Sequence, residues 1–60
     1  MDSFKFELRQ LVKLQESGET GTIIGRAEYA YAERAYLIRY KSGVGNAEEK
    51  WWGESAVEAM

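Results

Sequence analysis

The 60-residue sequence contains no cysteine, no histidine and no proline. Without cysteine it can form no disulfide, and without histidine it lacks Cys/His metal sites and the usual general base near neutral pH. Because proline is absent, its turns must depend on glycine, serine and asparagine. The serines have no histidine partner, so no nucleophile–base pair can be assembled. We therefore expect a protein that is not an enzyme and holds no metal or cofactor.

The sequence also lacks long apolar runs and a strong excess of one charge. No segment approaches the roughly 20 apolar residues of a membrane-spanning helix. The opening MDSFKFE is too charged for a signal peptide. The net charge of −2 argues against non-specific binding to nucleic acid. These features predict a soluble, cytosolic protein that does not enter a membrane.

Aromatic residues are what the chain has in abundance: six of its eight lie between Thr22 and Trp52. Sixty residues allow one domain, spanning 1–60. A chain of this length buries only about 60% of its unfolded surface when it folds. Without disulfides or metals, a chain of this size is stabilised by dense aromatic packing or by self-association. Packing is the first expectation, and a homodimer stays open.

Three segments are typical of strands: Thr22–Tyr29, Ala35–Tyr40 and Ala47–Trp52. An isolated glycine inside the first, Gly25, predicts a bulge or a close approach of backbone. The second has apolar residues on both faces, one of which carries Tyr36, Ile38 and Tyr40, and this predicts a central strand. Lys41–Asn46 then reads as a hairpin loop, with two glycines available for positive φ. In the third, adjacent tryptophans should point to opposite sides.

The two ends of the chain are shorter patterns. Phe4, Phe6 and Leu8 alternate with charged residues, which favours a strand, although an amphipathic helix over Ser3–Leu11 stays open. Leu11 breaks the phase that Val12 and Leu14 resume, so a bend or bulge is expected near residues 10–11. Residues 53–56 are typical of one helical turn, and Val57 is expected to begin a last short strand.

Four or five short strands with regular turn signals predict a small closed or nearly closed β-barrel. Closure would also remove the exposed edges of a flat sheet. A long hairpin, a one-turn helix and a final short strand form the usual ending of a Src-homology-3-like barrel. The predicted fold is therefore all-β: a small five-stranded Src-homology-3-like barrel with a short helical turn before the last strand.

Three runs, GETGTIIGRAEY (18–29), YLIRY (36–40) and WWGESA (51–56), resemble small uncharacterised proteins of tailed bacteriophages and prophages. The GRAEY and WWxES runs are the most specific parts. The resemblance implies a phage or prophage origin, hence a bacterial host, and a Src-homology-3-like or Tudor-like barrel; it implies no activity. A weaker resemblance is to the KOW motif of ribosomal and transcription proteins, whose copies are commonly basic, whereas this chain is acidic.

The aromatic residues are too many for one small core, so some rings should be exposed. Exposed Tyr and Trp beside carboxylates suit a cation or a proline-rich peptide. The predicted binding site comprises Tyr31, Trp51 and Trp52, with Glu48 and Glu49 as its acidic wall. The ordinary alternative is that the tyrosines cover the core with their hydroxyls in water. A protein-interaction module is the first functional hypothesis.

Two other hypotheses stay open. Arg26, Arg39 and Lys41, interleaved with tyrosines, would suit single-stranded nucleic acid through stacking and phosphate contacts. Cross-strand pairing with glutamates is the ordinary explanation of the same cations. The third hypothesis is a structural protein that self-associates through its spare aromatic residues.

Overall fold

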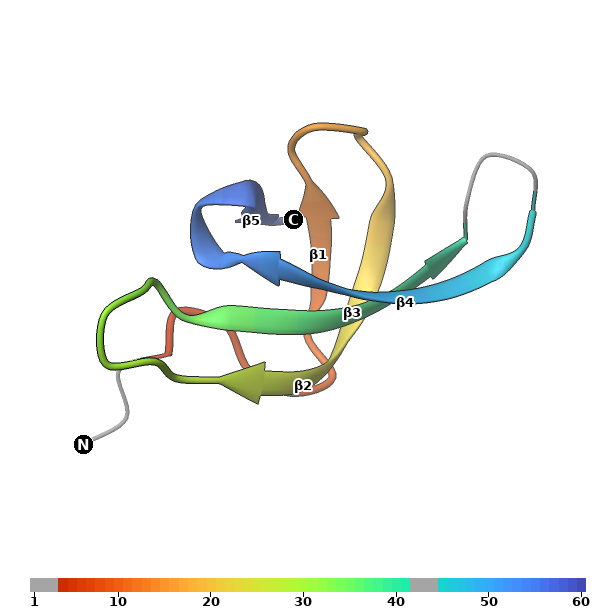
Figure 1. Cartoon of the computed structure of the whole chain (residues 1–60). Coiled ribbons are helices and arrows are strands. Elements are labelled where there is room, and N and C mark those ends of the chain that lie inside the picture. Colours follow the sequence, from red (N-terminus) through yellow and green to blue (C-terminus); the bar gives the residue numbers. More distant parts are fainter. Residues whose placement is uncertain (1–3, 42–44) are drawn as a thin grey trace.

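The computed structural model describes residues 4–41 and 45–60. They form one five-stranded antiparallel sheet in the order β4-β3-β2-β1-β5, which confirms the all-β prediction. The strands are β1 (Leu11–Leu14), β2 (Thr20–Ala27), β3 (Ala35–Lys41), β4 (Ala47–Gly53) and β5 (Val57–Ala59). Figure 1 shows β2 curving; it pairs with β3 from Gly21 to Ala27, whereas β1 pairs only with its first residues, Thr20–Thr22.

The curvature of β2 has a local cause. The register against β3 shifts between Ile23 and Gly25, so Ile24 is an extra residue in the ladder. This confirms the predicted bulge at the glycine; such bulges bend a strand and increase its twist. The strand itself covers Thr20–Ala27 rather than the predicted Thr22–Tyr29, beginning and ending two residues earlier. One bent strand thereby joins both halves of the sheet.

Strand β3 supplies the centre of the core. As predicted, it is an interior strand, paired with β2 and β4, and its residues Tyr36, Ile38 and Tyr40 are buried on one side. We call this side of the sheet the inner face, and the side that carries Leu37 and Arg39 the outer face. The buried core consists of Phe6, Val12, Leu14, Ile23, Tyr36, Ile38, Tyr40 and Val57, with Phe4 and Trp52 packed against it.

The N-terminal prediction was wrong. Residues 4–10 form neither a strand nor a helix but an irregular segment with a turn at Leu8–Arg9. Phe6 is buried, whereas Leu8 is half exposed. The backbone amides of Lys5 and Phe6 donate to the hydroxyl of Tyr36, at 3.1 and 3.4 Å, rather than to a neighbouring strand. The Tyr36 hydroxyl thus accepts the hydrogen bonds that a neighbouring strand would have accepted in the strand predicted from the alternation of residues 4–8. Residues 1–3 lie outside the described range.

The C-terminal prediction is confirmed. A 3-10 turn, η1 (Glu54–Ala56), follows β4 and leads directly into β5. The carboxylate of Glu33 accepts hydrogen bonds from the backbone N and the Oγ of Ser55, at 2.9 and 3.1 Å. The N of Glu54 donates to the carbonyl O of Arg34 at 2.8 Å. The connection between β2 and β3 therefore holds this turn in place.

Closure of the sheet into a barrel is not confirmed. Within the described residues, β4 and β5 are the two edges of the sheet and do not pair with each other. In the predicted hairpin loop, Lys41 extends β3 and Gly45 has the expected positive φ of 87°. The rest of that prediction, at residues 42–44, lies outside the described part of the chain.

The hydroxyl of Tyr36 connects three segments. It donates to Glu54 Oε2 at 2.5 Å while accepting from the amides of Lys5 and Phe6. Burial raises the pKa of Tyr36, the hydrogen bond to the Glu54 carboxylate raises it further, and the two backbone amides oppose the shift. The folded protein therefore holds this proton more tightly than the unfolded chain does.

This linkage predicts a loss of stability in alkali. Because the unfolded tyrosine releases its proton near pH 10, the free energy of unfolding should fall as the pH rises above about 10. Tyr36→Phe should remove that contribution while costing about 1–3 kcal/mol at neutral pH, since the buried Phe6 amide loses an acceptor. Urea unfolding of both proteins between about pH 8 and 11 measures this effect. Parallel declines in the two proteins would contradict the assignment.

Candidate functional site

The two adjacent tryptophans point to opposite faces, as predicted from strand geometry. Trp52 lies opposite Tyr36 in the ladder and packs against the core, with its ring centroid 6.2 Å from that of Tyr40. Trp51 lies opposite Leu37 on the outer face and keeps 53% of its surface exposed. The predicted site residues Trp51 and Trp52 therefore lie on opposite faces of the sheet. Trp51 is the one that is exposed on the outer face.

Trp51 lies across the sheet rather than projecting away from it. A Cβ placed on Gly25 would lie 3.7 Å from Cη2 of Trp51, although Gly25 is in β2 and Trp51 is in β4. The indole therefore passes over Leu37 in β3 and reaches the glycine. A glycine in a strand leaves room for an aromatic ring, which in turn covers the exposed backbone. One side of the ring is held by the sheet, and the ring remains half exposed.

The predicted acidic wall is divided between the faces. Glu49 lies opposite Arg39 on the outer face, and its Oε2 accepts hydrogen bonds from Arg39 Nε at 2.9 Å and Nη2 at 2.6 Å. Glu48 lies opposite Tyr40 on the inner face, with its Oε1 3.7 Å from Lys50 Nζ. Glu49, two residues before Trp51 on the same face of β4, is thus paired with Arg39.

Tyr31 lies away from the sheet faces. It is in the connection between β2 and β3, and its side chain is fully exposed. Tyr29, in the same connection, is half exposed. The five residues of the predicted binding site therefore fall in three places: Trp51 with Glu49 on the outer face, Trp52 with Glu48 on the inner face, and Tyr31 in the connection.

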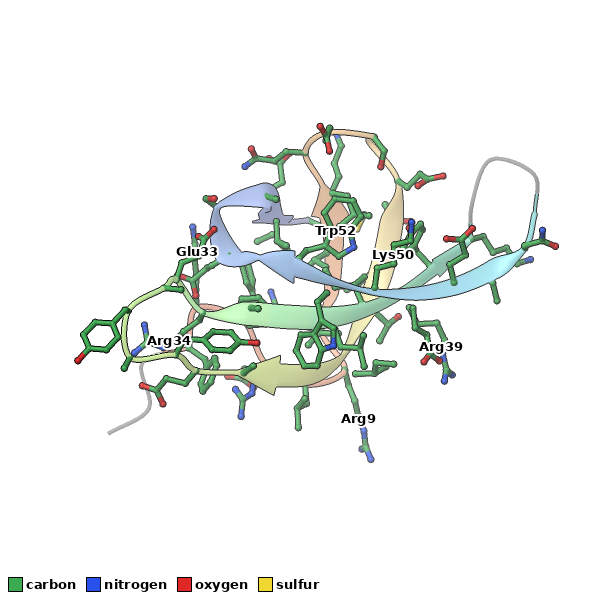
Figure 2. All side chains as sticks on the ribbon, viewed as in Figure 1. Arg9, Glu33, Arg34, Arg39, Lys50 and Trp52 are labelled. Carbon is green, nitrogen blue, oxygen red and sulfur yellow. The ribbon has the colours of Figure 1, made fainter. Side chains whose placement is uncertain are left out.

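The predicted cationic set is also divided. Arg39 and Lys41 lie on the outer face, but Arg26 lies opposite Tyr36 and so faces inward. Its Nη1 donates to the carbonyl O of Phe6 at 3.3 Å, and its guanidinium lies 4.6 Å from the centroid of Phe4. Arg26 thus helps to hold the N-terminal segment against the core. Figure 2 shows Arg39 and Arg9 pointing to one side of the sheet and Lys50 and Trp52 to the other.

An open depression of about 400 Å³ lies on the outer face, one row of residues away from Trp51. Its lining includes the side chains of Leu11, Thr20, Thr22, Arg39, Lys41 and Ala47. Small threonine and alanine side chains leave the hollow between the longer leucine, arginine and lysine chains. The lining is mainly apolar and includes hydroxyl and cationic groups.

Sequence reasoning missed two residues of this surface. Leu11 is 54% exposed and lines the depression. The signal in the sequence is its break in phase with Val12 and Leu14, which puts Leu11 on the opposite face of β1. Ile24 is exposed because it is the extra residue of the bulge.

No protein-family model, curated protein or solved structure matches the chain. In the part of the chain that the structure describes, no helix has the length and apolar character needed to cross a membrane. Among the same residues, no three acidic side chains come together as a metal site would require.

Proposed function

We propose that this chain is a small non-enzymatic interaction module of phage or prophage origin, which binds a protein partner in the cytoplasm of a bacterial host. Its contact surface is the outer face around Trp51. The observation that carries the proposal is the half-exposed indole held across Gly25 and Leu37. Tryptophan on a rigid scaffold gives a large contact area at low cost in conformational entropy, and it is enriched at interface centres.

A Src-homology-3-like barrel is the fold that we propose for this module. Three features support the assignment: the strand order, the bent β2 shared between two halves of the sheet, and the 3-10 turn between β4 and β5. The partly buried Trp52, which packs on the core from edge strand β4, would fill the space between the two halves.

Nucleic acid is the second candidate partner, because Arg39 and Lys41 share the outer face with an exposed indole. Stacking of bases on aromatic rings beside cations is the usual mode of binding to single strands. The inward position of Arg26 removes one of the three cations on which this hypothesis depended.

Affinity capture from bacterial lysate, with and without nuclease, tests the proposal. Trp51→Ala should lose a protein partner that the wild-type chain retains after nuclease treatment, because truncating a central interface tryptophan weakens binding by about 30-fold or more. Tyr31→Ala is the matched control, since it removes a fully exposed ring that lies outside the sheet. Mass spectrometry identifies the retained proteins.

Three outcomes oppose the proposal. Capture that is unchanged by Trp51→Ala excludes the outer face as the contact surface. Equal loss with Tyr31→Ala places the contact elsewhere or shows a general effect on the chain. Recovery that disappears with nuclease assigns the function to nucleic acid.

A further inference from the structure

The outer face carries a surplus of positive charge although the chain is acidic. Residues on either side of a buried strand residue face outward, so Lys13 and Glu58 lie on this face with Arg39, Lys41 and Glu49. Arg9, in the turn before β1, points to the same side as Arg39 (Figure 2). In these described segments the outer face carries four basic and two acidic side chains, a net charge of 4 − 2 = +2.

Two of the four cations already have a carboxylate nearby. Arg39 is bonded to Glu49, and Lys13 lies directly opposite Glu58 in the ladder. Within residues 4–41 and 45–60, Arg9 and Lys41 form no ion pair. The Arg39–Glu49 pair is itself well exposed, and such pairs are weak and exchange readily. Arg39 is therefore able to change partner when another carboxylate arrives.

We infer that the partner's contact segment is an acidic peptide that carries apolar side chains. This inference rests on the proposed function and names the chemistry of the partner. An apolar side chain would fill the depression beside Leu11 and continue onto Trp51. Carboxylates on either side of it would meet Lys41, Arg9 and the exchangeable Arg39. The hydroxyls of Thr20 and Thr22 in the lining of the depression would provide hydrogen bonds to the peptide backbone.

The same charges disfavour the two other partner chemistries. A cationic or proline-rich peptide needs an acidic wall, whereas this face carries two acidic side chains against four basic ones, and Glu49 is already paired with Arg39. A nucleic-acid strand needs a continuous track of cations, whereas Glu49 and Glu58 interrupt this face. Two unpaired cations match one or two carboxylates better than a run of phosphates.

Arg9 allows the contribution of one cation to be tested without disturbing the fold. Its φ is 73°, in the left-handed region that favours glycine, and its amide donates to the carbonyl O of Ile23 at 2.7 Å. A non-glycine residue in this conformation costs on the order of 1 kcal/mol. Arg9→Gly would relieve the strain and keep the turn, so it removes the charge without endangering the fold. Arg9→Gly therefore tests the charge of this side chain separately from the turn that carries it.

Selection from a displayed library of random peptides tests the inference without presuming a sequence. Peptides enriched on the wild-type protein but not on Trp51→Ala should contain Asp or Glu beside large apolar residues. Their affinity, measured by calorimetry, should fall about tenfold for Lys41→Glu and several-fold for Arg9→Gly. Raising the salt from about 0.05 to about 0.5 M should also weaken binding. Lys50→Glu is the matched control, because Lys50 lies on the inner face, and it should change the affinity by less than about twofold.

The results separate failure of the inference from failure of the proposed function. Trp51-dependent peptides that are neutral or basic overturn the acidic chemistry and leave the protein-binding function standing. An absence of any Trp51-dependent peptide overturns both. A thymidine dodecanucleotide that binds more tightly than every selected peptide, with the same loss in Lys41→Glu, assigns the face to single-stranded nucleic acid instead.

Discussion

Gly21→Ala should lower the free energy of unfolding by about 2–3 kcal/mol, one of the largest effects expected from adding one methyl group to this chain. A Cβ on Gly21 would lie 2.6 Å from Cγ2 of Ile38 and 2.7 Å from the carbonyl O of Arg39. The first contact is in the packed core and the second is with backbone, so neither neighbour can move aside cheaply. A folded chain of this length has a total stability of only about 3–9 kcal/mol.

Urea denaturation followed by tryptophan fluorescence measures this loss. Thr20→Ala is the control in the same strand, because Thr20 is exposed on the outer face. It should change stability by less than about 0.5 kcal/mol. A Gly21→Ala protein as stable as the wild type would show that β2 and β3 do not approach each other as closely as described.

Trp52→Ala should destabilise the protein by about 3 kcal/mol, whereas the same truncation of its neighbour Trp51 should cost about 1 kcal/mol. Trp52 packs against the core and meets Tyr40 edge to face, with ring planes at 71°. Its removal leaves a cavity beside buried side chains. Trp51 packs against the outer face of the sheet and is half exposed, so its truncation removes less buried apolar area than the truncation of Trp52 does.

The indole nitrogen of Trp52 sharpens this prediction. Nε1 is buried and has no hydrogen-bond partner among the described residues. Trp52→Phe therefore breaks no hydrogen bond and should recover most of the stability that Trp52→Ala loses. Thermal unfolding of the three variants gives the order Trp51→Ala, Trp52→Phe, Trp52→Ala from most to least stable. Equal losses in Trp51→Ala and Trp52→Ala would mean that both rings serve the core, which would remove the basis for a binding face.

Local patterns in the sequence were sufficient for the central part of the fold. The alternation of Tyr36, Ile38 and Tyr40 identified both the strand and its buried face, because side-chain direction in a strand depends only on parity. The same rule correctly placed Trp51 and Trp52 on opposite faces of the sheet. The glycine in β2 marked the bulge, since a strand interior rarely accepts glycine without a reason.

The composition of the candidate site depends on the register, which local patterns do not contain. Thr22 faces outward with Arg39, and in a regular strand Arg26, four residues later, would share that face. The extra residue Ile24 shifts the parity by one, so Arg26 turns inward. The prediction of a bulge at Gly25 was correct, and this bulge reverses the face of every later residue of the strand.

The prediction of a strand in the N-terminal segment was wrong for a different reason. Its alternation is real, and Phe6 is buried as a strand residue would be. What the pattern could not show is that Tyr36, thirty residues away, supplies the acceptor for the amide of Phe6. A tertiary hydrogen bond thus replaced the strand pairing that short-range periodicity implies.

A backbone amide NMR titration of the wild-type protein with the peptide most enriched by selection tests the central claim most directly. If the outer face is the binding surface, the largest shift changes should occur at Leu11, Thr22, Arg39 and Trp51, on four neighbouring strands. Changes centred on Lys50 and Trp52, or on the connection that carries Tyr31, would contradict the claim and place the partner on another surface.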